Sequence, residues 1–202
     1  MLIFGAGYSA NAEDALPAAA DSVGRGILVV DAFTGSVLWQ AGPSPSGAVR
    51  NVVVPGMTYS LASDATLLDR DFDGFVDRVY VPDTGGNVWR VDIGDADPAN
   101  WAVNLLASIA GPAPSGSRKF LYPPDVVYGS DANGPYDAVL IGSGDREHPL
   151  DTTVVNRYYM FKDRKTGSSG AGQATITEAN LYDATADTLQ TASGSDLATA
   201  KV

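Results

Sequence analysis

Residues 78 to 92 read RVYVPDTGGNVWRVD, and this stretch decides the fold. Two short runs rich in Val, Tyr and Trp, at 78–83 and 88–92, flank the turn sequence Thr84-Gly85-Gly86-Asn87. Such runs, bounded by Gly and Asn, are typical of paired β-strands rather than of a helix. The stretch therefore predicts two strands joined by a tight turn.

Related units lie on both sides of this hairpin, with strands that begin roughly 50–60 residues apart, close to the period of blade-type repeats. The strands at 2–4 and 139–141 each end in Gly-x-Gly, and each precedes a polar loop. A second strand follows each loop, at 26–31 and at 157–163, and in the first unit a further strand that contains Trp39 follows at 36–39. Since a single blade cannot bury both of its faces, these units are expected to stack on one another. Large aromatic side chains such as Trp39 and Trp89 are expected to pack between them.

The sequence thus predicts an all-β protein, a partial modified β-propeller with quinoprotein-like blades. We expect residues 1–202 to form part of one propeller domain, with blade-like units at about 1–60, 61–110 and 118–170. Residues 168–202 are rich in Ser, Gly, Ala and Thr and are expected to form an inserted loop with short helical turns, near 177–183 and 196–201. A closed propeller has at least four blades. We therefore expect the chain to be a fragment of a longer protein.

Composition narrows the class of protein. The 202 residues carry 13 Lys and Arg against 24 Asp and Glu, a formal charge of −11, and 45% are hydrophobic. This balance supports a sizeable core and argues against nucleic-acid binding, which needs a basic surface. The absence of Cys excludes disulfides and thiolate metal sites. No apolar run approaches the roughly 20 residues of a membrane span, and MLIFGAGYS lacks the features of a signal peptide.

An acidic loop, DRDFDGFVD at 69–77, precedes the hairpin. Its alternating carboxylates and single glycine predict a calcium site, because Ca²⁺ takes six to eight oxygen ligands and a Gly permits the sharp turn around it. The predicted ligands are Asp69, Asp71, Asp73, the backbone carbonyl of Phe75, and Asp77. Arg70, Phe72 and Val76 are expected to point away from the ion.

The loop is not an EF-hand, because Tyr80 stands at the twelfth position where that motif has Glu, and the flanking residues look like strands. A solvated acidic turn is the alternative. A partial second copy, Asp131-x-Asn133-Gly134-x-x-Asp137, lacks the first ligand and is better interpreted as an Asn-Gly turn. The single His148 is interpreted as a surface residue rather than a general base, since no nucleophile motif accompanies it.

Several motifs, taken in order, resemble the PilY (PilC) proteins of type IV pili. The central one is Asp69-x-Asp71-x-Asp73-Gly74-x-x-Asp77 followed by Gly86-Asn87-x-Trp89-Arg90-x-Asp92. Ile3-Phe4-Gly5-x-Gly7-Tyr8 and the run from Val30 to Trp39 resemble the family's preceding segments. Ile141-Gly142-Ser143-Gly144-Asp145-Arg146 and Glu178–Asp183 resemble its following segments, whereas Pro82 stands where the family often has Gly.

The resemblance implies a C-terminal modified β-propeller in a large exported protein at the bacterial outer surface, the pilus tip or the outer membrane. It implies roles in pilus biogenesis, in control of pilus extension and retraction, in adhesion and in twitching motility. The expected cofactor is Ca²⁺. The expected partners are minor pilins or other pilus-tip proteins and host or abiotic surfaces, with no nucleic acid and no membrane span. The same five calcium ligands carry over from the family, and no enzymatic activity is implied.

Two other functions remain open. The run Asp31–Trp39 resembles the tryptophan-docking repeat of quinoprotein dehydrogenases, although that pattern is lost in the later turns and their adjacent Cys pair is absent. The other is a generic calcium-loop propeller that serves as a cell-surface interaction module.

Overall fold

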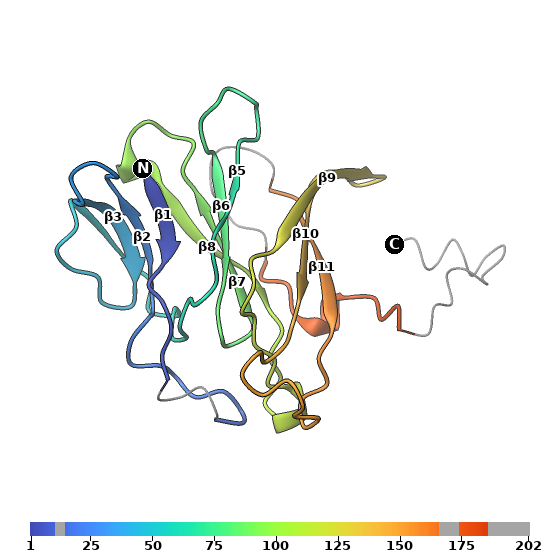
Figure 1. Ribbon diagram of the computed structural model, residues 1–202. Helices are drawn as coiled ribbons and strands as arrows, with labels where there is room; N and C mark the ends of the chain where they lie inside the picture. The colour runs from blue at the N-terminus through green and yellow to red at the C-terminus, as the bar shows by residue number, and fades with distance from the viewer. Residues whose placement is uncertain (11–14, 166–173, 186–202) are drawn as a thin grey trace.

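The computed structural model describes residues 1–10, 15–165 and 174–185, and their regular structure consists of three β-sheets and three single-turn 3-10 helices (Figure 1). The first sheet contains β1 (Leu2–Gly5), β2 (Ile27–Val30), β3 (Val37–Gly42) and β4 (Arg50–Val53). The central sheet contains β5 (Thr66–Leu68), β6 (Arg78–Pro82), β7 (Asn87–Asp92) and β8 (Ala102–Ser108). The third sheet, in the order β11-β10-β9, contains β9 (Asp125–Asp131), β10 (Gly134–Gly142) and β11 (Tyr158–Asp163). The helices are η1 (Pro98–Asn100), η2 (Pro114–Gly116) and η3 (Glu178–Asn180).

The sheets lie side by side, and the central one is covered on both faces (Figure 1). Every residue of β6 and β7 is buried. Because side chains alternate across a strand, the two faces take different residues. Val79, Val81, Trp89 and Val91 pack against the first sheet, whereas Tyr80 and Val88 pack against the third. The core therefore consists of two layers, one on each side of the central sheet.

The hairpin of β6 and β7 is held by the side chain of Asp83, which is fully buried. One carboxylate oxygen accepts the backbone N–H groups of Gly85 and Asn87 at 2.9 and 3.0 Å, and the other accepts the indole N–H of Trp89 at 2.8 Å. Gly86 has φ +75°, a left-handed conformation that glycine adopts without strain. Local turn chemistry thus forms the hairpin that the sequence predicts.

The all-β prediction is confirmed, and the three predicted repeat units fall on the three sheets. β1 and β10 both end near Gly-x-Gly, and each pairs antiparallel with the strand after its polar loop, β2 and β11. Trp39 and Trp89 belong to one core cluster between the first and central sheets, as expected. Three sheets do not by themselves form a closed propeller, and the domain limits stay a prediction.

Four strands were not expected from the sequence: β4, β5, β8 and β9. β4 pairs with β3 in parallel, an arrangement that no local turn signals. The predicted helical turn near 177–183 is present as η3. The one at 196–201 lies outside the described residues.

Candidate metal centre

The acidic loop at 69–77 joins β5 to β6 at one end of the central sheet (Figure 1). Phe72 and Gly74 have φ values of +62° and +92°, so the backbone takes the left-handed conformation twice within three residues. Positive φ at a bulky residue such as Phe72 is uncommon and needs support from its surroundings. These two positions curl the loop tightly enough to bring side chains from its start and its end together.

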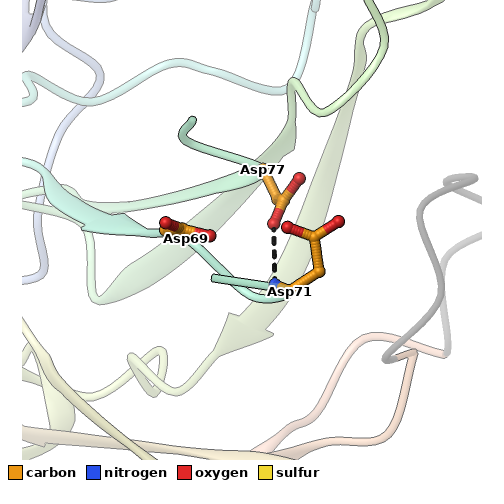
Figure 2. Close-up of side chains that lie close together, drawn as sticks. All are labelled: Asp69, Asp71 and Asp77. Atoms are coloured by element: carbon orange, nitrogen blue, oxygen red, sulfur yellow. Dashed lines mark hydrogen bonds between the residues drawn. The ribbon is translucent and has the colours of Figure 1, made fainter. Parts of the chain in front are cut away.

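Three of the predicted ligands converge in this curl. Carboxylate oxygens of Asp69, Asp71 and Asp77 all lie within 4.8 Å of one another (Figure 2). Carboxylate oxygen is the ligand type that Ca²⁺ and Mg²⁺ prefer. The donor set therefore fits a hard divalent cation.

The loop's own backbone orients these carboxylates. Oδ2 of Asp77 accepts the N–H groups of Arg70 and Asp71 at 2.6 and 3.4 Å. The carboxylate of Asp69 accepts the N–H groups of Asp73 and Gly74 at 3.2 and 2.9 Å. Hydrogen bonds between the two ends of the loop thus hold it closed around the carboxylates.

Asp73 lies outside the group of three, and its Oδ1 accepts the N–H of Phe75 at 2.8 Å. The roles of Asp73 and of the Phe75 carbonyl as ligands stay predictions.

Gly94 lies next to the carboxylate of Asp77, and its lack of a side chain leaves space for that carboxylate. A Cβ atom at position 94 would come within 2.7 Å of Oδ1 of Asp77, closer than such atoms approach in proteins. The backbone also fixes Asp77, because its carbonyl accepts the N–H of Ile93 at 2.7 Å and its N–H donates to Leu68 at 2.9 Å. The position of this carboxylate therefore depends on a neighbouring strand as well as on the loop.

The residues expected to point away from the centre do so. Phe72 is 77% exposed, Val76 packs against the core between the first and central sheets, and the guanidinium of Arg70 reaches Asp137 in β10.

The second acidic motif does not assemble as a metal site. Asn133 lies in the two-residue turn between β9 and β10, and Gly134 has φ +104°. Asp131 pairs with Lys162 and Arg164 at 2.8 and 2.6 Å, and these bonds hold the pKa of its carboxyl well below its usual range. Asp137, by contrast, is fully buried among arginines. The interpretation as an Asn-Gly turn is the one that the geometry supports.

His148 lies in the loop after β10 and is half exposed. Its Nδ1 is 3.4 Å from Oδ2 of Asp145, which also accepts from the ammonium of Lys119 at 2.9 Å. These residues line a pocket of about 200 Å³. The contacts anchor the loop to the chain at Lys119, in agreement with a structural role for His148.

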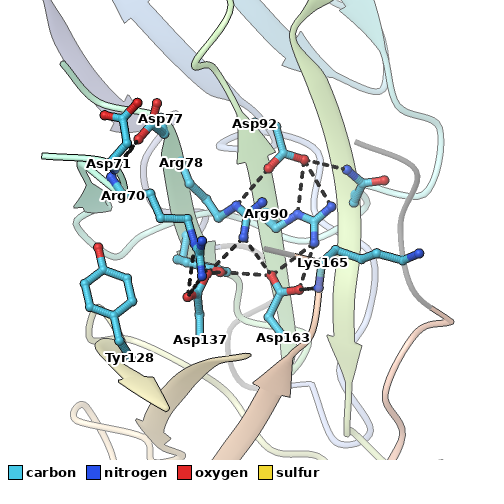
Figure 3. A network of polar contacts seen from close by, with 12 residues as sticks. Arg70, Asp71, Asp77, Arg78, Arg90, Asp92, Tyr128, Asp137, Asp163 and Lys165 are labelled. Carbon is cyan, nitrogen blue, oxygen red and sulfur yellow. Dashed lines mark hydrogen bonds and ion pairs between the residues drawn. The ribbon is translucent and has the colours of Figure 1, made fainter. Parts of the chain in front are cut away.

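Sequence reasoning missed a network of six charged side chains between the central and third sheets, all of them buried except the partly exposed Arg70. It contains Arg70, Arg78, Arg90, Asp92, Asp137 and Asp163 (Figure 3). The hydroxyl of Tyr80 donates within it, to Asp163 at 2.9 Å. The signal was present in part, because Arg78, Arg90 and Asp92 stand at alternate positions of strands otherwise rich in Val. Their partners in β10 and β11 are distant in sequence and gave no such signal.

These features define a class of protein: an all-β chain with three stacked sheets and an acidic loop suited to a hard cation. A curated protein of Xylella fastidiosa, named "Type IV pilus biogenesis factor PilY1 homolog", is 29% identical over 117 residues, which cover 55% of this chain and 7% of that protein. The crystal structure of the Pseudomonas aeruginosa PilY1 C-terminal domain matches with a TM-score of 0.56 and 19% identity, over 77% of this chain and 35% of the solved one.

The resemblance to PilY-type proteins, first drawn from the motifs, is thus confirmed by a sequence relative and by a shared fold. No family model matches the chain. The chain spans a small part of the curated relative and about a third of the solved domain. Among the residues that the structure describes, no helix has the length and apolar character needed to cross a bilayer.

Proposed function

We propose that this chain is a calcium-binding part of the β-propeller of a type IV pilus biogenesis factor. The observation that carries the proposal is the convergence of Asp69, Asp71 and Asp77 in a chain whose relatives are PilY1-type proteins. The ligand set would be these three carboxylates with Asp73 and the carbonyl of Phe75. Further blades would cover the outer faces of the first and third sheets, where Leu2, Phe4, Tyr158 and Met160 are exposed.

The proposal that the loop holds an ion also rests on the repulsion between its carboxylates. Two unit charges 4 Å apart repel by about 1 kcal/mol in water and by about 4 kcal/mol at an effective dielectric constant of 20. Bound calcium would supply the opposing charge. In its absence, the carboxylates favour a more open loop. The ion would therefore shift the loop toward the closed conformation, because only that conformation offers all the ligands together.

In the cell, the closed loop would favour the extended pilus, and its opening would favour retraction. The partners would be minor pilins or other pilus-tip proteins, and through them host or abiotic surfaces. The protein would act outside the cell, at the outer surface or the pilus tip. This function needs no catalysis, and the relatives carry the names of pilus factors rather than of enzymes.

Calcium titration of the 202-residue chain by calorimetry, with thermal melts, tests the proposed site. We expect saturable binding that raises the melting temperature in the wild type and is lost in Asp77→Ala. Asp64→Ala removes an exposed carboxylate outside the loop and is the matched control. A folded wild-type chain that binds no calcium would reduce the acidic loop to a solvated turn.

The pilus role needs a separate test in a piliated bacterium that carries the full-length gene. We expect Asp77→Ala to change the number of surface pili and twitching motility, whereas Asp64→Ala leaves both unchanged. Normal pili in a variant that no longer binds calcium would favour a generic calcium-loop interaction module instead.

A further inference from the structure

Arg70 connects the acidic loop to the third sheet. Its backbone N–H donates to Asp77 within the loop at 2.6 Å. Its guanidinium donates to the carboxylate of Asp137 in β10, with Nη2 to Oδ1 at 2.8 Å and Nε to both oxygens at 3.2 Å (Figure 3). Since one residue makes both contacts, a change in loop backbone moves the side chain that binds the third sheet.

Tyr128 in β9 provides a second connection. Its hydroxyl donates to the backbone carbonyl of Asp69 at 3.0 Å. Its ring lies 5.6 Å from Cζ of Arg70 and 5.9 Å, edge to face, from the ring of Phe72. The tyrosine thus contacts the first, second and fourth residues of the loop.

The far end of this connection is buried. Asp137 has no exposed surface and also accepts from Arg78 at 2.9 Å, and the hydroxyl oxygen of Tyr80 lies 3.2 Å from it. A buried carboxylate depends on its donors, because an unpaired charge in a protein interior is costly. The loop conformation that places Arg70 therefore affects how β10 sits on the central sheet.

We propose that the acidic loop is an inter-sheet latch, in which closure of the loop and docking of β9 and β10 on the central sheet stabilise each other. The inference rests on the proposed calcium site, and it identifies what the ion regulates: the contact between two successive sheets rather than the loop alone. Arg70 and Tyr128 are positioning residues in this latch, and neither is proposed as a ligand of the ion.

Coupling of this kind is reciprocal. If the closed loop strengthens the Arg70–Asp137 contact, then the same contact must strengthen calcium binding by the same factor. Simple electrostatics predicts the opposite, since removal of a positive charge beside the site should make a cation bind more tightly. The two effects differ in sign, so one measurement separates them.

The test is calorimetric calcium titration of the 202-residue chain and of Arg70→Met, which keeps much of the side-chain length and removes the hydrogen bonds to Asp137. We expect calcium to bind Arg70→Met about fivefold or more weakly than the wild type, at the lower end of typical coupling factors. Arg164→Met, which removes a 2.6 Å ion pair with Asp131 on the same sheet, is the matched control and is expected to bind as the wild type does.

Tyr128→Phe supplies a variant with no change of charge, and it decides the question if Arg70→Met does not fold. We expect it to weaken calcium binding in the same direction, through the lost hydrogen bond to Asp69. Hydrogen exchange gives an independent readout: calcium should slow exchange of β9 and β10 amides in the wild type but much less in Arg70→Met.

Equal or tighter binding by both variants, or calcium protection confined to residues 69–77, would overturn the latch while leaving the calcium site intact. Absence of binding by the folded wild type would overturn the site itself, and with it the inference.

Discussion

Replacement of Tyr80 by Phe isolates one hydrogen bond in the buried network. Tyr80 has no exposed surface, and its hydroxyl lies 2.9 Å from Asp163 and 3.2 Å from Asp137. Burial and the nearby Asp163 raise the pKa of the hydroxyl, so it keeps the proton that it donates. Because a hydroxyl has one hydrogen, the variant loses a single hydrogen bond to a charged acceptor. This loss should lower the free energy of unfolding by about 1.5–3 kcal/mol. No cavity adds to this figure, because only an oxygen atom is removed.

Urea denaturation at neutral pH measures this loss as a shift in midpoint with an unchanged slope. Tyr159→Phe is the matched control, because it removes a comparable hydroxyl whose acceptor, Glu178, is partly exposed, at 36%. We expect Tyr159→Phe to lower the free energy of unfolding by much less than Tyr80→Phe does. Equal losses in the two variants, or a loss below about 0.5 kcal/mol for Tyr80→Phe, would mean that the buried carboxylates do not depend on this donor.

Three further predictions concern glycines and one buried acid. Gly94→Ala should weaken calcium binding at small cost in stability, because its Cβ would displace the Asp77 carboxylate; calorimetry and a thermal melt of the same sample measure the two effects. Gly86→Ala should lower the free energy of unfolding by about 2–4 kcal/mol, because the residue has positive φ and its Cβ would lie 2.8 Å from a backbone carbonyl oxygen. Gly35→Ala, with similar φ but open space around it, should lower it by about 1–2 kcal/mol. Urea unfolding measures both losses, and equal losses would contradict the steric contribution at Gly86. Burial raises the pKa of Asp83 to about 6, so the part of the stability that is linked to protonation of its carboxyl is present below about pH 4 and is lost as the pH rises through 6. Carboxyl NMR should show titration near pH 6, and a midpoint below 4 would show that its N–H donors outweigh burial.

The sequence was most informative where structure depends on neighbours along the chain. The hairpin at 78–92 was predictable because Asp83, Gly86 and Trp89 complete the turn within a few residues of one another. The convergence of Asp69, Asp71 and Asp77 followed from their spacing around Gly74.

What could not be predicted depends on partners distant in sequence. Arg78 meets Asp137 across 59 residues, and no local pattern indicates which carboxylate will face a buried arginine. The parallel pairing of β4 with β3 follows from the path of a connecting loop rather than from strand composition. The contact of Arg70 with Asp137 was missed for the same reason, although its direction away from the loop centre was expected.

The two layers of the core place different constraints on sequence change among homologues. Between the first and central sheets the contacts are apolar, and such contacts tolerate exchange of one aliphatic side chain for another of similar volume. Between the central and third sheets, three guanidinium groups meet three carboxylates, so their formal charges cancel only as a set. These six positions should therefore covary among homologues. A chimera of two divergent relatives should tolerate a crossover between β4 and β5 more readily than one between β8 and β9, which would separate the three arginines from Asp137 and Asp163.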